Sequence, residues 1–380
     1  MSSSYIPAKT KELLFGQAAG RCEYRGCNKL VTEDHHTGKQ GKFSVFAHIV
    51  ADSPDGPRGD EVRSPLLARA IENLMLLCFD HHRLIDDEDE DGHPEALLLE
   101  MKRDHEDRVQ WLTEINGEHR TLVLTMGTAI GTRMGLPTDA EVLPACLPRY
   151  PLRRPVSINL TETRILDGTA VMWAQGGTEI IHAAREVQER LRRDRLDHVS
   201  VFAIAPMPLL MLLGRHLGDL QHVDAKPKRR EPPGWGWWPS DVLDVDFGHR
   251  CHDEGRTGSE VLLVLSVSDD VDLDLARTAG SPGALLYELR VDRKPMTDIV
   301  RSAAEARRFM RRVREVLTEI RASHGAQITI RVLPAVPNCL AVAFGQALLP
   351  KTDPRMVVHD LNRDAGGWAE VLVLLDDLTA

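Results

Sequence analysis

Three cysteines and a histidine near the start of this 380-residue chain constrain its fold more than any other feature. Cys22 and Cys27 have four residues between them, and Cys78 and His81 have two. Such spacings are typical of paired ligands that meet at one tetrahedral zinc ion. The pattern therefore predicts a structural Zn²⁺ site that joins an early loop to a later helix and stabilises a domain with a thin core. Buried cysteines beside an unrelated histidine are the alternative.

Four further polar residues of the same region suit the hydrolysis of a phosphodiester, which needs a base and a cation. His48, on a strand expected over residues 43–50, is the predicted base, because a neutral imidazole accepts a proton near pH 7. Asn73 is expected to hold the nearby loop or the imidazole. His82 and Asp86, four residues apart on a helix, are expected to bind Mg²⁺ or another divalent cation. Ordinary structural roles for the two histidines are the alternative.

This set resembles the HNH (ββα-metal) endonuclease family over roughly residues 15–110. Ala47-His48-Ile49 is similar to the family's first histidine segment, and Asn73-Leu74-Met75-Leu76-Leu77-Cys78 to its Asn-Leu-x-x-Leu-Cys segment. His82 falls at the family's final histidine, and Asp86 falls where some members carry another ligand. Many members have Asp or His directly before the first histidine. This chain has Ala47 there, so its metal shell departs from the family pattern.

The order of predicted elements indicates an α/β multidomain protein. An apolar stripe at helical spacing ends at Asn116-Gly117, which sets the expected endonuclease domain at residues 1–116. Five prolines follow within residues 117–155, which are expected to form a Pro-rich connector. Over residues 156–380, strands and helices alternate, as in parallel sheets covered by helices.

Two segments of this C-terminal region, residues 201–214 and 330–345, resemble each other. Each predicts a strand, a Pro-containing turn and an apolar helix. A proline stands eight residues before a glycine in both copies, as Pro206 before Gly214 and Pro337 before Gly345. The repeat predicts two fused Rossmann-like halves, roughly residues 156–255 and 256–380. Coincidence between two ordinary strand–turn–helix units is the alternative.

Open parallel sheets bind ligands beyond the carboxyl ends of their strands, where helix N-termini present free N–H groups. The two Pro-containing turns are expected at that place. Between them, the segment from Lys226 to Trp238 combines four cations, which suit phosphates, with three of the chain's six tryptophans, which suit base stacking. The predicted ligand-binding residues are Pro206, Met207, Pro208, Lys226, Lys228, Arg229, Trp235, Trp237 and Asn338. A loop packed on the core, or a contact between copies, is the alternative.

Over nearly its whole length the chain resembles the HNH–SAVED effectors of bacterial CBASS antiphage defence. The segment from Ala47 to Gly59 and the two Pro-to-Gly segments carry the resemblance. It implies a SAVED sensor of two CARF-like halves that binds a cyclic di- or trinucleotide made by a partner synthase. It also implies that copies then assemble into a dimer or tetramer, and that the HNH domains cut double-stranded DNA.

The net charge of -10 lacks the basic excess that is usual in dedicated DNA-binding proteins. We therefore expect a single copy to bind DNA weakly, and assembly to supply further contacts. Six unevenly placed cysteines argue against a disulfide framework and indicate a reducing cytoplasm. The chain shows no long apolar run and no secretory signal, so no membrane partner is expected.

Two other functions stay open at this point. One is a constitutive, restriction-like HNH endonuclease whose C-terminal half recognises DNA; it would cut plasmid with Mg²⁺ and no nucleotide. The other is a catalytically inactive, zinc-stapled nucleotide sensor, because Ala47 could mark a lost metal site. In that case His48→Ala would leave every activity unchanged.

Overall fold

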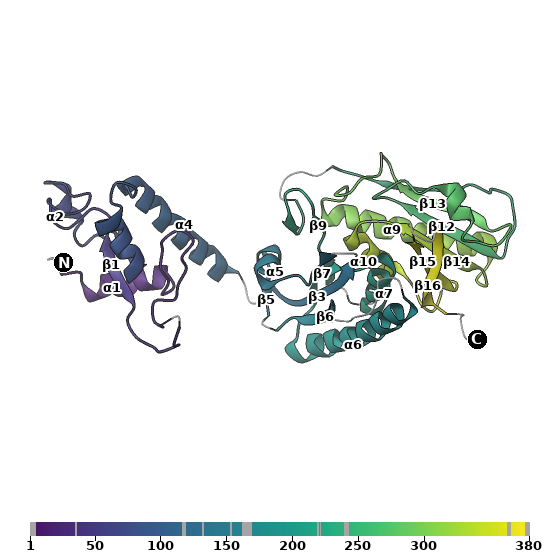
Figure 1. The fold of residues 1–380 in the computed structure, drawn as a ribbon, viewed down its shortest axis with the longest axis horizontal. Helices are drawn as coiled ribbons and strands as arrows, with labels where there is room; N and C mark the ends of the chain where they lie inside the picture. Colours follow the sequence, from purple (N-terminus) through teal and green to yellow (C-terminus); the bar gives the residue numbers. More distant parts are fainter. Residues whose placement is uncertain are drawn as a thin grey trace. The chain divides into compact units, whose positions relative to one another are not determined.

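The protein is described here by a computed structural model, and the chain divides into two compact units, residues 1–116 and 117–380 (Figure 1). The structure describes residues 5–34, 36–115, 119–130, 133–152, 154–161, 169–218, 220, 222–238, 243–362 and 366–376. The predicted junction at Asn116-Gly117 lies outside these ranges. Among the helices described, none is both long and apolar enough to cross a membrane.

The first unit is built on a two-stranded antiparallel sheet. β1 (Ser44–His48) pairs with β2 (Leu74–Cys78), so that Ser44 lies opposite Cys78 and His48 opposite Leu74. All five residues of β2 are buried, as expected for a short apolar run that is covered on both faces. The helical elements of this unit are α1 (Ala8–Gln17), α2 (Arg63–Leu67), η1 (Ile71–Asn73), α3 (Phe79–Arg83), η2 (Leu84–Glu88) and α4 (Glu95–Glu114). α3 follows β2 directly and packs on both strands.

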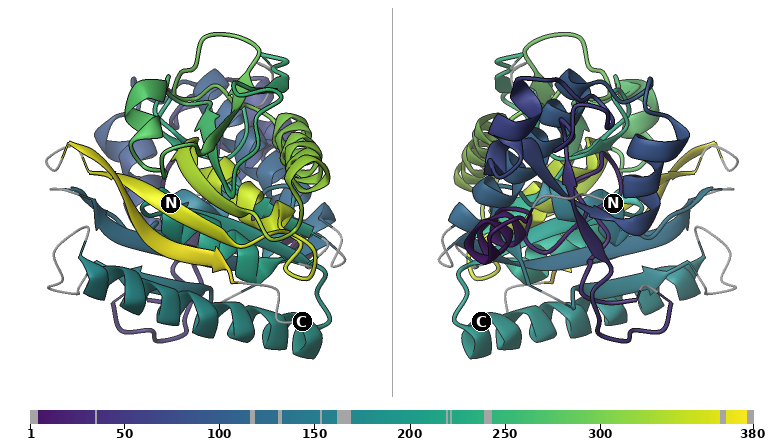
Figure 2. Two further views of the ribbon diagram at one scale, coloured as in Figure 1. Left: turned by 90° about the vertical axis from the view of Figure 1, so that its right-hand side faces the viewer. Right: turned by 90° about the vertical axis from the view of Figure 1, so that its left-hand side faces the viewer.

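The second unit begins with a parallel sheet in which β3 is a central strand. Its strands are β6 (Val156–Leu160), β3 (Arg120–Ile130), β7 (His198–Ile204) and β8 (His222–Ala225), in that spatial order. Short strands β4 (Arg133–Met134) and β5 (Tyr150–Pro151) pair with the two ends of β3. The long helix α6 (Ala170–Asp194) packs against β6 and against helix α7 (Met207–Leu217) (Figure 2).

The prediction of a connector over residues 117–155 is therefore wrong. β3 lies inside this segment and pairs with β6 and β7 along its length. The five prolines come after β3, in and around α5 (Asp139–Ala145), while β3 itself contains none. Proline-rich turns here separate a core strand from the rest of its sheet and do not separate two domains.

A second sheet follows and has four parallel strands with an antiparallel strand at each edge. Its strands are β11 (Phe247–Cys251), β13 (Leu285–Val291), β12 (Glu260–Ser266), β14 (Thr329–Ala335), β15 (Met356–Asn362) and β16 (Gly367–Leu375), in that spatial order. Its helices are α8 (Leu273–Arg277), α9 (Ala303–His324) and α10 (Asn338–Ala347). β9 (Lys228–Arg229) and β10 (Gly234–Trp235) form a small hairpin between the two sheets in the sequence.

The parallel strands of both sheets follow one order, in which the first strand lies between the second and the third. In the first half β3 lies between β6 and β7, with β8 next; in the second half β12 lies between β13 and β14, with β15 next. The two Rossmann-like halves that the repeat predicts are thus confirmed. Their boundaries differ from 156–255 and 256–380, since the first half starts at β3 and the second includes β11.

The predicted repeat places two glycines where the halves meet. α7 and α10 pack against each other, and a Cβ on Gly214 would lie 1.9 Å from the Val342 carbonyl oxygen. A Cβ on Gly345 would lie 1.9 Å from the Met211 carbonyl oxygen. In both cases the obstructing carbonyl belongs to the residue three positions before the other glycine. The two glycines therefore allow a symmetric close crossing of the helices, and one apolar core runs through both halves.

Candidate functional site

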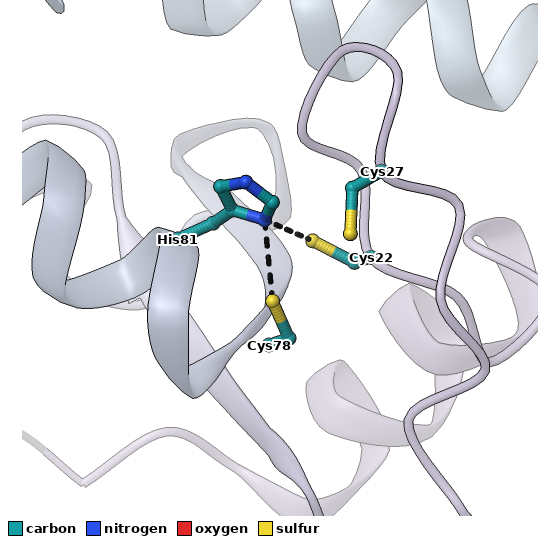
Figure 3. A group of neighbouring side chains, drawn as sticks. All are labelled: Cys22, Cys27, Cys78 and His81. Atoms are coloured by element: carbon teal, nitrogen blue, oxygen red, sulfur yellow. Dashed lines mark hydrogen bonds between the residues drawn. The ribbon is translucent and has the colours of Figure 1, made fainter. Parts of the chain in front are cut away.

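Cys22, Cys27, Cys78 and His81 converge in the first unit, with their ligand atoms all within 4.8 Å of one another (Figure 3). The His81 Nδ1 atom lies 3.2 Å from the Cys78 sulfur and 3.7 Å from the Cys22 sulfur. A tetrahedral zinc ion separates sulfur and nitrogen ligands by about 3.5 Å. The four side chains therefore fit a structural zinc ion, as the spacing predicts, and would hold it without an open position.

The surroundings of this cluster suit a structural metal. Burial lowers the pKa of His81, which keeps its imidazole neutral and able to bind a cation. The Tyr24 ring stacks on His81 with centroids 4.0 Å apart, and the Tyr24 hydroxyl lies 2.9 Å from the His93 Nε2 atom. His93 Nδ1 in turn lies 2.6 Å from the Asp89 carbonyl oxygen. This chain of contacts fixes the ring plane of His81 and joins the cluster to the start of α4.

His48 stands at the end of β1 and is buried. Its Nε2 atom lies 2.9 Å from the Ala68 carbonyl oxygen, which can only accept a hydrogen bond. Nε2 therefore carries the ring proton of the neutral imidazole, and Nδ1 keeps the lone pair that a base requires. The contact also fixes the ring orientation relative to the residue that follows α2.

Asn73 holds the loop after β1 and does not hydrogen-bond to His48. Its amide nitrogen donates to the carbonyl oxygens of Val50 and Leu67, at 2.8 and 3.3 Å, and its amide oxygen accepts from the Val50 N–H at 2.8 Å. Of the two roles predicted for Asn73, these contacts correspond to the first. Asn73 thus sets the course of the chain on both sides of the loop.

His82 and Asp86 lie together, and a third residue holds them. His82 Nε2 is 3.3 Å from one Asp86 carboxylate oxygen, and the Arg58 guanidinium binds the other at 2.5 Å. The same guanidinium donates to the carbonyl oxygens of Ile49 and Ile85, at 2.6 and 2.7 Å. One planar group thus connects the residue after His48 with the carboxylate that faces His82.

Arg58 is the residue that the sequence interpretation missed. It lies in the turn-rich loop after β1, has a positive φ of 54°, and its side chain is largely buried. A buried arginine with three acceptors is costly to expose or delete, which marks it as a fixed part of this site. Its only sequence signal is a lone arginine among glycines and prolines, which is equally typical of an exposed turn.

In the second unit, three of the predicted ligand residues have partners within the fold. Lys226 Nζ lies 2.7 Å from Asp224, and Lys228 Nζ lies 2.7 Å from Glu141. The Asn338 side chain donates to the carbonyl oxygens of Ala203 and Lys226 and accepts from the Lys228 N–H. Because Asn338 opens α10 of the second half, these bonds fasten that half to β7 and to the segment that follows β8.

Both predicted tryptophans have partners within the fold. Trp235 is 4% exposed and meets Phe202 edge to face in the core of the first half. Trp237 is half-buried and donates from its indole nitrogen to Asp224 at 3.0 Å. Arg229 lies over the Trp238 ring, 5.6 Å from its centroid. The prediction that the Trp235 indole binds the ligand is wrong, because this ring is buried. A large aromatic ring stabilises the fold more when it is buried than when it is exposed.

The N-termini of α7 and α10 occupy the place that the Pro-containing turns predict. Each helix starts directly after its proline, Pro206 or Pro337, at the carboxyl end of a parallel strand. Neither N-terminus has a side-chain cap. Pro208 has no N–H, and the N–H groups of Leu209 and Leu340 bond to the carbonyl oxygens of Pro206 and Pro337, so the first N–H of each helix, on Met207 and Asn338, is the one best placed for an anion. Met207 is half-buried and Pro208 is buried, so a ligand at this end of α7 would meet mainly backbone atoms.

The architecture thus defines a two-part α/β protein in which a unit with a Cys3His cluster precedes a duplicated Rossmann-like region. Residues 180–374 match the family model described as "SMODS-associated and fused to various effectors sensor domain", or SAVED. The match spans 195 of the 380 residues (180 to 374 inclusive), and the chain belongs to the SAVED family. No curated protein matches the chain.

Solved structures similar to this chain include Cap4 SAVED/CARF-domain containing receptors. The Acinetobacter baumannii receptor with the cyclic trinucleotide 2'3'3'-cAAA is 10% identical, with a TM-score of 0.42 over 73% of this chain and 56% of that one. Its structure with 3'3'3'-cAAA gives a TM-score of 0.44 at the same identity and coverage. The Moraxella osloensis receptor gives 0.41, at 10% identity, over 73% of this chain and 54% of that one. The chain therefore spans little more than half the length of these receptors.

Proposed function

We propose that the second unit binds a cyclic oligonucleotide and that the first unit is a metal-dependent DNA endonuclease which this binding activates. The observation that carries the proposal is the joining of a SAVED sensor, in one chain, to a unit in which Arg58 links the segment of the anchored His48 to the His82–Asp86 pair. A sensor needs an output, and these side chains are the ones that phosphodiester hydrolysis uses. The activity belongs to the antiphage role that the resemblance to CBASS effectors implies.

The arrangement of the two halves supports a ligand with repeating phosphates. α7 and α10 are related by the symmetric crossing at Gly214 and Gly345, and their uncapped N-termini follow equivalent strands. Each such end carries about half a positive charge, which suits a phosphodiester. A cyclic di- or trinucleotide supplies several equivalent phosphates in a small ring and could engage both halves at once.

His48 is the proposed general base. Its Nε2–H is held by the Ala68 carbonyl, and its Nδ1 atom would accept the proton of the attacking water. Asn73 acts through the loop that it fixes, as a positioning residue. Removal of the imidazole should therefore affect the rate of cutting more than the stability of the fold.

His82 and Asp86 are the proposed ligands of a catalytic divalent cation. Arg58 already partly neutralises Asp86, so His82 is expected to be the stronger ligand, with water and substrate completing the shell. Such a cation, when bound, would neutralise charge that develops on the phosphate. Ala47 offers no ligand atom, which makes the protein's share of this shell smaller than in the family pattern.

A basic and aromatic surface next to His48 supports DNA as the substrate. Ser44, Phe46 and His48 alternate along β1 and so share one face of the strand. The ammonium groups of Lys11 and Lys42 lie 5.7 and 5.6 Å from the centroid of the half-buried Phe46 ring. These cations would contact phosphates beside the scissile bond, although the chain as a whole is acidic.

Activation sets an energetic requirement on the ligand. A shift of the nuclease from about 1% to 99% active needs roughly 5.5 kcal/mol of differential binding between the two states. Contacts to several phosphates and bases can supply this amount, particularly when dimers or tetramers form and add further contacts.

Plasmid cutting by the full chain tests the proposal. Purified protein, Mg²⁺ and supercoiled plasmid are incubated with a panel of synthetic cyclic di- and trinucleotides, with 3'3'3'-cAAA as the first member. We expect cutting with at least one nucleotide and none without, and no cutting by His48→Ala. Cutting without any nucleotide would support the constitutive enzyme instead. If no combination of nucleotide and divalent cation gives cutting, the first unit is not a nuclease.

A further inference from the structure

A basic cavity lies at the opposite ends of α7 and α10 from the helix N-termini discussed above. Its volume is about 440 Å³, within the range of small-molecule sites. It is lined by Gln188 and Arg192 of α6, Arg215 and His216 of α7, and Gly218, Leu220, Leu348 and Pro350 beyond the helix ends. Gly218 and Leu348 are the C-terminal caps of α7 and α10. The cavity is thus formed where both halves of the sensor meet α6.

The charges around this cavity are unbalanced. Arg192 and Arg215 line it, and Arg185 lies seven residues before Arg192 on the same face of α6. Among the described residues, none of these arginines forms an ion pair, and no lining residue carries a carboxyl group. Asp219, which follows Gly218 in the sequence, lies outside the described residues. The Arg192 Nε atom donates to the Gln188 carbonyl oxygen at 3.3 Å, and its charge has no carboxylate partner among the described residues.

Helix capping does not account for all of this charge. Cations at a helix C-terminus stabilise the dipole, which is worth about half a negative charge at each helix end. Two helix ends therefore offset about one of the two charges of the lining arginines, and a positive charge remains. A phosphate monoester carries about -1.5 to -2 charges at pH 7. The remaining charge has the sign that attracts such a group.

Arg215 supplies an independent sign that the site is incomplete. Its Nε atom is buried and has no hydrogen-bond partner. A buried donor of a charged group that lacks a partner is costly, so an acceptor is expected there. The backbone of Arg215 is fixed, because it lies against the crossing point at Gly345. Burial, together with Arg215 and Arg185, lowers the pKa of the neighbouring His216, which leaves it neutral and able to donate one hydrogen bond.

We propose that this cavity binds a small phosphate monoester of nucleotide size, with Arg192 and Arg215 on the phosphate. Arginine suits this group because its planar guanidinium can bind two phosphate oxygens at once. The apolar part of the wall, formed by Leu220, Leu348 and Pro350, would cover a sugar or base. A cyclic oligonucleotide contains only phosphodiesters, so this site is distinct from the proposed activator site and does not depend on it.

Calorimetric titration of the full chain tests this proposal, with 5′-AMP and pyrophosphate as probes in a phosphate-free buffer. AMP carries its terminal phosphate on a nucleoside, whereas pyrophosphate has no nucleoside. Comparison of their affinities therefore shows which of the two kinds of ligand the cavity binds. We expect AMP to bind more tightly, and Arg215→Ala and Arg192→Ala each to weaken binding about tenfold or more. Arg192 is exposed, so its variant should fold normally.

Arg193→Ala is the matched control, because Arg193 is adjacent on the same helix but forms an ion pair with Asp194 at 3.0 Å. It should bind AMP as the parent chain does. AMP binding that depends on Arg192 and Arg215 supports the proposal. Binding of pyrophosphate without binding of AMP would overturn it, because pyrophosphate is not a monoester of nucleotide size. The proposal is overturned if neither probe binds, if Arg192→Ala and Arg215→Ala bind as well as Arg193→Ala, or if a cyclic trinucleotide displaces AMP.

Discussion

Different forces stabilise the interior of each of the two units of this chain. The first unit spans 116 residues and has 15 buried residues in its apolar cluster. The Cys3His cluster and Arg58 connect its elements. The second gathers 55 in its largest cluster, and its halves meet at the close crossing of α7 and α10 and at the hydrogen bonds of Asn338. A small unit that cannot bury enough apolar surface depends on a metal and on polar ties, whereas a duplicated sheet depends on close packing.

The largest effect is expected from removing zinc. Structural zinc ions bind with about 10 kcal/mol or more, which is comparable to the whole stability of a small domain. Chelation, or Cys22→Ser, should therefore unfold the first unit and leave the second folded, as read by hydrogen exchange along the chain. Cys251→Ser is the control, since Cys251 lies outside the cluster and should leave one zinc per chain. If the amides of β1 and β2 stay protected from hydrogen exchange in a zinc-free chain, the metal does not stabilise the first unit.

The next effect separates activity from stability within the first unit. His48→Ala should lower the rate of activated DNA cutting by about 10²- to 10⁴-fold, because the base is lost. Zinc content, the midpoint of unfolding and cyclic-nucleotide binding should stay within error of the parent chain. His36→Ala, at an exposed position of the same unit, is the control and should cut normally. Retained cutting by His48→Ala would refute the role of His48 as base.

The packing of the second unit can be tested at the helix crossing. Gly345→Ala places a Cβ 1.9 Å from a backbone carbonyl, so α7 and α10 must separate, at a cost of about 3 kcal/mol. Thermal unfolding should show a lower transition for the second unit only. Gly177→Ala is the control, since its Cβ meets only a Leu212 methyl at 3.6 Å and alanine favours the helix. An unchanged transition for Gly345→Ala would mean that the helices are not packed as described.

The smallest effect concerns the DNA-facing cations. Lys42→Ala should weaken DNA binding by the activated protein a few-fold and reduce the slope of log affinity against log salt by about 1, because one phosphate contact is lost. Lys29→Ala is the control, because Lys29 is paired with Asp80 at 3.0 Å. Equal salt slopes for the two variants would place the DNA elsewhere on the first unit.

The sequence was most informative where the chemistry of a residue is restrictive. A thiolate set at metal-ligand spacing predicts its own convergence, and Cys22, Cys27, Cys78 and His81 do converge. The repeat was also visible, because proline and glycine have few other reasons to recur at one spacing. Conversely, Trp235 shows that an aromatic residue in a polar, proline-rich segment can belong to the core. The buried clamp of Arg58 depends on tertiary contacts that sequence spacing does not reveal.

The proposed function requires communication between the two units, and the ratio of plasmid-cutting rates with and without a cyclic oligonucleotide tests this most directly. The measurement uses the full chain with Mg²⁺ at fixed salt and a saturating nucleotide from the panel, and residues 1–117 alone as the comparison. We predict a rise in rate on the order of 100-fold for the full chain and none for the fragment. Equal rates for the full chain with and without every nucleotide tested, or a fragment that responds to nucleotide, would contradict the account.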